Sequence, residues 1–198
     1  LLATMFFGLI YYFMVSPVSH TYQIDLGIPS AVAVSAVMLG SIVNAGARLV
    51  LPTLADKVGR IVCIKGVLIV AVIAMGVLAV SRSLAVTVAV VLMYGCYGGI
   101  MGSFPSLTSS IFGMKHTGEN YGFVMFGIVF ATFGAPAISG LVSSNGYEMN
   151  VVFGIGAVFA VIAFVCLTLL GRNLVKEHAE KSVGAKKGTA QVRKPQAE

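Results

Sequence analysis

Residues 41–60 read SIVNAGARLVLPTLADKVGR and place one arginine, Arg48, in a segment with no other charge before Asp56. A cation at the centre of a membrane helix costs roughly 2.5–3.5 kcal/mol unless it meets an anion or reaches the membrane surface. After Pro52 the stretch becomes charged, and we expect it to leave the helix there and form a short loop. Arg48 is therefore the first residue to consider for a function.

The composition around this stretch is that of an integral membrane protein. Of the 198 residues, 58% are hydrophobic and only 10% are charged, which excludes an ordinary soluble domain. The opening segment lacks the charged start, short apolar run and small-residue cleavage site of a signal peptide. Because the chain begins at Leu1, already within an apolar run, we interpret it as a piece of a longer polypeptide.

Six apolar runs are long enough to cross a bilayer, for which a helix needs about 20 residues. The predicted spans are residues 1–22, 30–51, 61–80, 84–112, 121–142 and 151–171. Short connections between them indicate that neighbouring spans pack antiparallel. The sequence therefore predicts an all-α membrane protein formed by one six-transmembrane-helix bundle over residues 1–171.

Basic residues are concentrated after the second, fourth and sixth spans, and the other connections contain only Arg82. The positive-inside rule therefore predicts a multi-pass protein of the cytoplasmic membrane with its C-terminus in the cytoplasm. The same rule explains the net charge of +6 better than a nucleic acid partner does, and no nucleic acid partner is predicted. Residues 172–198 are predicted to be a basic, disordered cytoplasmic tail, of which the first part, RNLVKEHAEK, could briefly continue the last helix. This tail either attracts anionic membrane lipid or only fixes the topology.

Nothing in the sequence indicates a cofactor, a metal site or an enzyme. The three cysteines (Cys63, Cys96 and Cys166) are far apart and form no CxxC pair, and no histidine stands at ligand spacing. A catalytic centre within the bundle would need clustered His, Asp or Glu, which the six spans lack.

A polar stripe follows the second span. At 100° per residue, Ser41, Asn44 and Arg48 project within about 60° of one another. An arginine fork can donate two hydrogen bonds to a carboxylate, so this stripe suits a small organic anion. Alternatively, Arg48 is an interfacial residue whose guanidinium extends to the nearby charged loop, and the residues alone leave both interpretations open.

The fourth span combines glycines with aromatic residues. Residues 95–102 contain two overlapping GxxxG spacings, which predict close packing against another helix. Tyr94 and Tyr97 lie three residues apart on one face with Phe104 beyond them. These rings either line a cavity beside a bound anion or pack in the core.

Residues 52–61 resemble the cytoplasmic signature of the major facilitator superfamily. The matching positions are Leu54, Asp56, Lys57, Gly59 and Arg60. Pro52 replaces the leading glycine, and Ile61 stands where a second basic residue is common. The resemblance implies a gating motif that helps to close the cytoplasmic side.

Residues 102–140 are similar to the tenth and eleventh helices of the oxalate/formate antiporter group, relatives of the monocarboxylate transporters. The matching positions are Phe104-Pro105, Phe112-Gly113, Lys115, Gly118, Asn120-Tyr121-Gly122, Gly134 and Pro136. The resemblance implies that the chain is helices seven to twelve of a twelve-helix transporter, whose N-terminal six-helix half is its missing partner. Arg48 then corresponds to the eighth-helix arginine that binds the substrate carboxylate.

Two departures from that group bear on the substrate. Oxalate-selective members carry a lysine in the eleventh helix, but residues 121–140 contain none. A dicarboxylate would therefore lack one partner. Proton-coupled members often carry an aspartate where this chain has Asn44.

Together these features predict a secondary transporter that moves a small carboxylate by alternating access. Lactate, pyruvate and formate fit this prediction better than oxalate. Arg48 would bind the carboxylate, Asn44 and Ser41 would add hydrogen bonds, and Tyr94, Tyr97 and Phe104 would form the walls. The alternatives are a major facilitator carrier of another solute, such as a sugar or drug, or a non-transporting membrane sensor or assembly subunit.

Overall fold

The computed structural model describes the backbone of residues 1–192 and the side chains of residues 1–175, and this part of the chain is α-helical throughout. The helices are α1 (Leu2–Val15), α2 (Ser19–Asp25), α3 (Ser30–Val58), α4 (Arg60–Val80), α5 (Ala85–Phe112), α6 (Thr117–Ser144) and α7 (Met149–Val192). Five helices are long and apolar enough to cross a membrane, and α1 and α2 together make a sixth candidate span. The predicted all-α class is confirmed.

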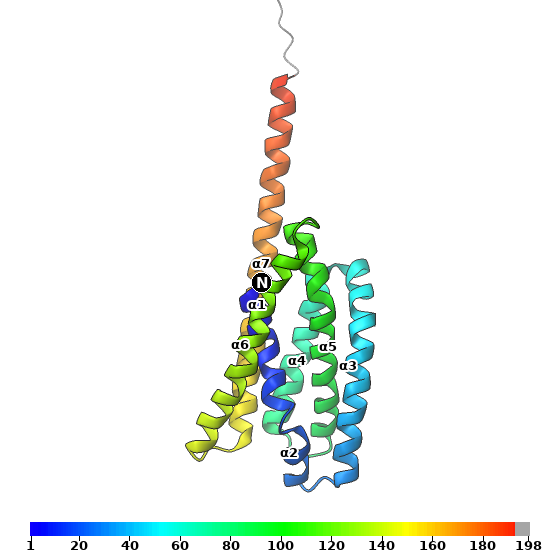
Figure 1. The fold of residues 1–198 in the computed structure, drawn as a ribbon, viewed down its shortest axis with the longest axis vertical. Helices are drawn as coiled ribbons and strands as arrows, with labels where there is room; N and C mark the ends of the chain where they lie inside the picture. Colours follow the sequence, from blue (N-terminus) through cyan, green and yellow to red (C-terminus); the bar gives the residue numbers. More distant parts are fainter. Residues whose placement is uncertain (193–198) are drawn as a thin grey trace, which may run out of the picture.

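The helices form one bundle, in which α5 lies between α3 and α4 and has the largest buried share of the five long candidate spans (Figure 1). The main packing partner of α3 is α5, that of α6 is α1, and that of α4 is α7. In Figure 1, α3 and α6 lie at opposite margins, and each buries only four residues, none larger than valine. Their outer faces carry large apolar side chains, including Ile42 and Phe133. These faces suit contact with lipid or with further helices.

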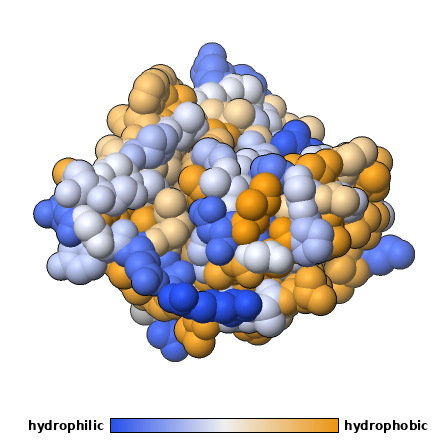
Figure 2. Space-filling model, turned by 90° about the horizontal axis from the view of Figure 1, so that it is seen from below, coloured by the Kyte–Doolittle hydropathy of each residue, from blue (hydrophilic) through white to orange (hydrophobic). Residues whose placement is uncertain are grey.

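Viewed from the α2 end, the bundle shows hydrophilic residues on its end face and strongly hydrophobic residues around much of its rim (Figure 2). An apolar flank with a polar end is the distribution that a bilayer favours, because lipid meets the sides and water meets the ends.

The first predicted span, residues 1–22, is not one continuous helix. The structure corrects it to α1 and α2, which are bent by 47° at a short break over residues 16–18. Pro17 lies in this break and has no amide hydrogen to donate to the carbonyl of Phe13. The helical hydrogen-bond ladder is therefore interrupted there.

The loop predicted after Pro52 is also corrected. Pro52 lies inside α3, which continues to Val58, and Gly59 alone connects α3 to α4. One proline removes one hydrogen bond from the ladder, whereas reversing the chain needs a residue with positive φ. Gly59 supplies it with φ +105°. The helix thus ends at the glycine, and Asp56 and Lys57 are helical residues.

The helix that contains the sixth predicted span continues beyond residue 171. The structure extends α7 as a helix to Val192, through most of the segment for which the sequence predicts disorder (Figure 1). This segment contains many Ala, Glu and Lys residues, which favour helix. Residues 193–198 lie outside the described part. At 1.5 Å per residue, α7 is about 66 Å long, roughly twice the thickness of a bilayer core.

A polar network ties three helices together at the α2 end. The Tyr22 hydroxyl lies 3.0 Å from the Leu78 carbonyl oxygen and 2.9 Å from Asn150 Oδ1. Glu148 Oε2 accepts hydrogen bonds from Asn150 Nδ2 at 3.0 Å and from Arg82 Nη2 at 2.9 Å. These contacts fix the segment beyond the α1–α2 bend to α4 and α7.

Candidate functional site

The backbones of α3 and α5 approach each other closely where the candidate site lies. A Cβ atom added to Gly98 would overlap the Asn44 carbonyl oxygen and lie 3.0 Å from the Asn44 Cα. A Cβ atom added to Gly102 would lie 2.7 Å from the Arg48 carbonyl oxygen. The close packing predicted from the GxxxG spacings is confirmed. It fixes Asn44 and Arg48, two of the three residues of the polar stripe, against α5.

Arg48 lies deep in α3 and turns away from the charged end of that helix. Asn44 is the middle residue of the 29-residue helix, and Arg48 follows one turn later, about 15 Å from the Gly59 end. Arg48 Nε donates a 3.0 Å hydrogen bond to Asn44 Oδ1. The side chain therefore bends towards the middle of the helix, which is opposite to the direction that a snorkelling arginine would take.

The outer edge of the Arg48 guanidinium has no hydrogen-bond or ion-pair partner among the residues whose side chains the structure describes. Nε is used by Asn44, while the two terminal amino groups form no hydrogen bond with any described residue. The three ion pairs of the described residues all involve other side chains. Because the side chain is also exposed, both terminal nitrogens are available to the two oxygens of a carboxylate.

Aromatic rings from α1 and α5 lie beside this cation. Arg48 Cζ is 5.5 Å from the centroid of the Tyr97 ring, within the range of a cation–π interaction. Tyr12 stacks on Tyr97 with a centroid distance of 3.9 Å and an interplanar angle of 12°. Tyr94 meets Tyr12 edge to face at 5.3 Å. We call Tyr12, Tyr94 and Tyr97 the tyrosine cluster.

The structure places the predicted site residues unequally. Asn44 accepts a hydrogen bond from Arg48, and the ring of Tyr97 lies within cation–π range of Arg48. Ser41 donates its hydroxyl hydrogen to the Val37 carbonyl oxygen at 2.9 Å, so its only donor is used within its own helix. Phe104 is completely buried and packs in the core. It therefore does not form a wall beside the cation.

Two tyrosines near the cation were not among the predicted site residues. Tyr12 of α1 stacks on Tyr97 and so lies near the site. Tyr121 of α6 is close enough to interact electrostatically with Arg48 and Tyr97. Tyr121 belongs to the Asn120-Tyr121-Gly122 motif, which was a usable signal. No spacing rule within the first span distinguishes Tyr12 from its neighbour Tyr11.

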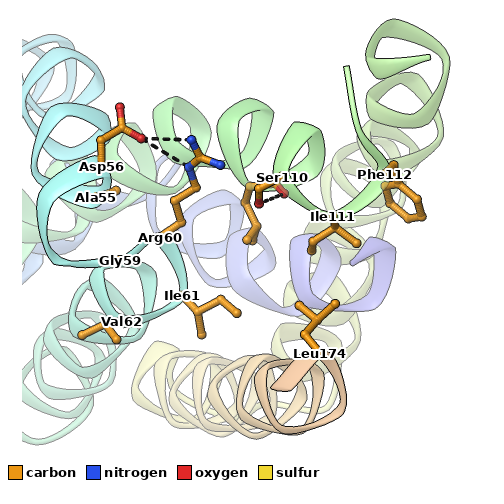
Figure 3. Close-up of a pocket in the computed structure, with 11 residues that line it drawn as sticks. Ala55, Asp56, Gly59, Arg60, Ile61, Val62, Ser110, Ile111, Phe112 and Leu174 are labelled. Atoms are coloured by element: carbon orange, nitrogen blue, oxygen red, sulfur yellow. Dashed lines mark hydrogen bonds and ion pairs between the residues drawn. The ribbon is translucent and has the colours of Figure 1, made fainter. Parts of the chain in front are cut away.

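Three of the gating-motif residues, Asp56, Gly59 and Arg60, line a cavity of about 690 Å³ at the basic end of the bundle (Figure 3). Asp56 Oδ1 accepts hydrogen bonds from Arg60 Nε at 3.3 Å and Nη2 at 3.2 Å, across the Gly59 turn. The other two, Leu54 and Lys57, line a separate hollow beside α3. The Asp56 carboxylate is thus paired with the arginine of its own motif.

Comparison with known proteins identifies relatives that are longer than this chain. A family model described as Major Facilitator Superfamily matches residues 1–128. An uncharacterised MFS-type transporter, YhjX, of Escherichia coli K12 is 36% identical over 97 residues, which are 48% of this chain and 24% of that protein. The oxalate:formate antiporter of Oxalobacter formigenes is 26% identical over 155 residues, which are 77% of this chain and 37% of that protein. The chain thus spans well under half of either relative.

Proposed function

Because the chain belongs to the major facilitator superfamily, whose model matches residues 1–128, we propose that it is the carboxylate-binding half of a secondary transporter for small monocarboxylates. This superfamily consists of membrane transporters, not enzymes. The predicted family is therefore confirmed. The substrate and the place of the chain within a complete transporter are our proposals.

The free fork of Arg48 is the observation that carries the proposal. The two terminal amino groups form no hydrogen bond or ion pair with any described residue, and they lie beside an aromatic cluster near the middle of the helix. They match the two oxygens of one carboxylate. The bond from Nε to Asn44 orients the guanidinium before the ligand arrives, which lowers the entropic cost of binding. One cation suits one carboxylate, so we propose lactate, pyruvate or formate as substrates in preference to oxalate.

The margins of the bundle indicate where the other half of the transporter would pack. Both α3 and α6 leave most of their surface unburied, and the exposed Arg48 lies on α3. A second six-helix half placed against these margins would enclose the carboxylate near the membrane midplane, as in alternating-access carriers. This chain would then supply helices seven to twelve, with its basic end in the cytoplasm. The Asp56–Arg60 pair would steady the closed cytoplasmic side.

The direct test is uptake by the full-length polypeptide that contains this chain, reconstituted in lipid vesicles. We expect uptake of labelled lactate, pyruvate and formate, each inhibited by the others and only weakly by oxalate. Uptake of a neutral sugar without uptake of any carboxylate would instead identify a carrier of another solute. If no solute were taken up by well-folded protein, a sensor or assembly subunit would be favoured.

Placing an acid beside the arginine gives a pH-dependent test of the same site. In Asn44→Asp, the new carboxylate would pair with Arg48 at i,i+4 spacing and compete with the substrate for the guanidinium. We expect monocarboxylate affinity to fall at least tenfold at neutral pH. Affinity should recover partly as the pH is lowered, because protonation of the new aspartate releases Arg48. The control is Asn44→Ala, which should weaken binding without this additional pH dependence. Equal pH profiles for the two variants would contradict the proposed contact.

A further inference from the structure

A chain of three hydroxyl groups ends beside the candidate site. Ser16, at the bend between α1 and α2, has its Oγ 3.4 Å from both the Tyr12 and the Tyr94 hydroxyl oxygens. Ser16 donates to Tyr12. Because a serine hydroxyl has only one hydrogen, Tyr94 must donate in the other contact. The hydrogen bonds therefore run from Tyr94 through Ser16 to Tyr12.

This direction leaves the Tyr12 hydroxyl with a hydrogen to donate. The hydrogens of Tyr94 and Ser16 are used within the chain, while that of Tyr12 has no acceptor among the described residues. Accepting a bond from Ser16 also polarises the Tyr12 hydroxyl and makes it a better donor. An unused donor in a half-buried position at membrane depth is costly, so an incoming acceptor would be favoured there.

The position of Tyr12 relative to the cation is fixed by a third ring. The ring of Tyr97 lies within cation–π range of Arg48 and also stacks on the ring of Tyr12. Tyr12 also lies within electrostatic range of Arg48 itself. The ring of Tyr97 therefore links the cationic fork of Arg48 to the ring that carries the Tyr12 hydroxyl donor.

We propose that Tyr12 is a second substrate-binding residue, whose hydroxyl donates a hydrogen bond to a substrate oxygen outside the carboxylate. This inference rests on the proposed function and narrows it. The transporter would select 2-hydroxy and 2-oxo monocarboxylates over unsubstituted ones of the same length. Ser16 and Tyr94 act as positioning residues, because they orient the Tyr12 hydroxyl.

The neighbouring tyrosine provides a matched control. Tyr11 is completely buried, and its hydroxyl has no hydrogen-bond partner among the described residues. Tyr11→Phe therefore makes the same chemical change one position away, without touching the cluster. Removing an unpaired buried hydroxyl is expected to leave stability unchanged or to raise it.

The test compares two acids of equal carbon number, lactate and propionate, in vesicles containing the full-length transporter. Propionate lacks the 2-hydroxyl oxygen that Tyr12 would bind. In Tyr12→Phe we expect the KM for lactate to rise about tenfold, which corresponds to one lost hydrogen bond of about 1.4 kcal/mol. The KM for propionate should stay within twofold, and Tyr11→Phe should change neither value. Ser16→Ala keeps the ring stack, and it should raise the KM for lactate by a smaller factor than Tyr12→Phe.

The outcomes separate this inference from the proposed function. Two results together would overturn the inference: Tyr12→Phe raises the KM for lactate and for propionate equally or changes neither, and Ser16→Ala leaves the ratio of the two KM values unchanged. Tyr12 would then have only a packing role. If the unaltered transporter took up neither acid, the proposed function would fail, and this inference would fail with it.

Discussion

Replacing Arg48 with glutamine is expected to abolish saturable monocarboxylate uptake. Glutamine keeps a polar side chain near Asn44 but removes the charge and the two-pronged edge that would hold the carboxylate. Losing one partner of a desolvated, hydrogen-bonded charge pair costs about 2–5 kcal/mol, equivalent to a roughly 30- to 5,000-fold loss of affinity. The carboxylate affinity of Arg48→Lys should lie between that of Arg48→Gln and that of the unaltered protein, because lysine keeps the charge but not the planar fork.

The control for the Arg48 variants is the same substitution at Arg82. This arginine pairs with Glu148 in the polar network at the α2 end, and both side chains of the pair are largely exposed. An exposed ion pair is worth only about 0–1 kcal/mol, so Arg82→Gln should retain most uptake. Measured initial rates at several lactate concentrations distinguish the variants. Full activity in Arg48→Gln would refute the assignment of Arg48 as the carboxylate-binding residue.

The second large effect is expected from adding a single methyl group at Gly98. In Gly98→Ala, the new Cβ would overlap the Asn44 carbonyl oxygen, and it would meet backbone, which cannot rotate away as a side chain can. Overpacking of this kind costs about 1–3 kcal/mol, occasionally more. We expect a lower apparent melting temperature in detergent. Carboxylate uptake should also fall, because α3 must move and carry Asn44 and Arg48 with it.

Gly76 of α4 supplies the comparison for this packing effect. A Cβ atom added there would have no heavy atom within 4 Å, apart from its chain neighbours and the nearby backbone of its own helix. Gly76→Ala should therefore keep or raise the melting temperature, since alanine is the better helix former. Should both glycine variants behave alike, the stability of the bundle would not depend on the close α3–α5 approach.

The differences between the predicted and observed spans each have a local cause. Most predicted span ends lie within a few residues of the observed helix ends, because the thickness of a bilayer sets the length of an apolar span. Pro17 and Pro52 had opposite effects that their residue type does not reveal. Pro17 lies in a break between two helices. Pro52 lies inside α3, which continues past it, and Gly102 of α5 packs against Pro52. The end of α3 depends on the positive φ of Gly59 instead.

The candidate site was predictable only in part, for a geometric reason. The helical period places Ser41, Asn44 and Arg48 on one face, but it does not say which groups a side chain on that face will bond. The structure bonds Ser41 to its own helix and joins Asn44 to Arg48. Phe104 shares the helix of Tyr97, yet it lies in the core. Tyr12 and Tyr11 are adjacent, but only Tyr12 reaches the cluster.

The amino-acid sequence by itself determined the membrane class, the approximate limits of most spans, the family, and the single arginine within the second span. These follow from hydropathy, residue spacing and charge, which are properties of one helix at a time. Only the tertiary structure decided that the Arg48 fork turns towards mid-helix and that Tyr12 joins the cluster beside it. Both depend on how faces of different helices meet, since contacts between residues as distant as Tyr12 and Tyr97 are made by packing and have no counterpart in local periodicity.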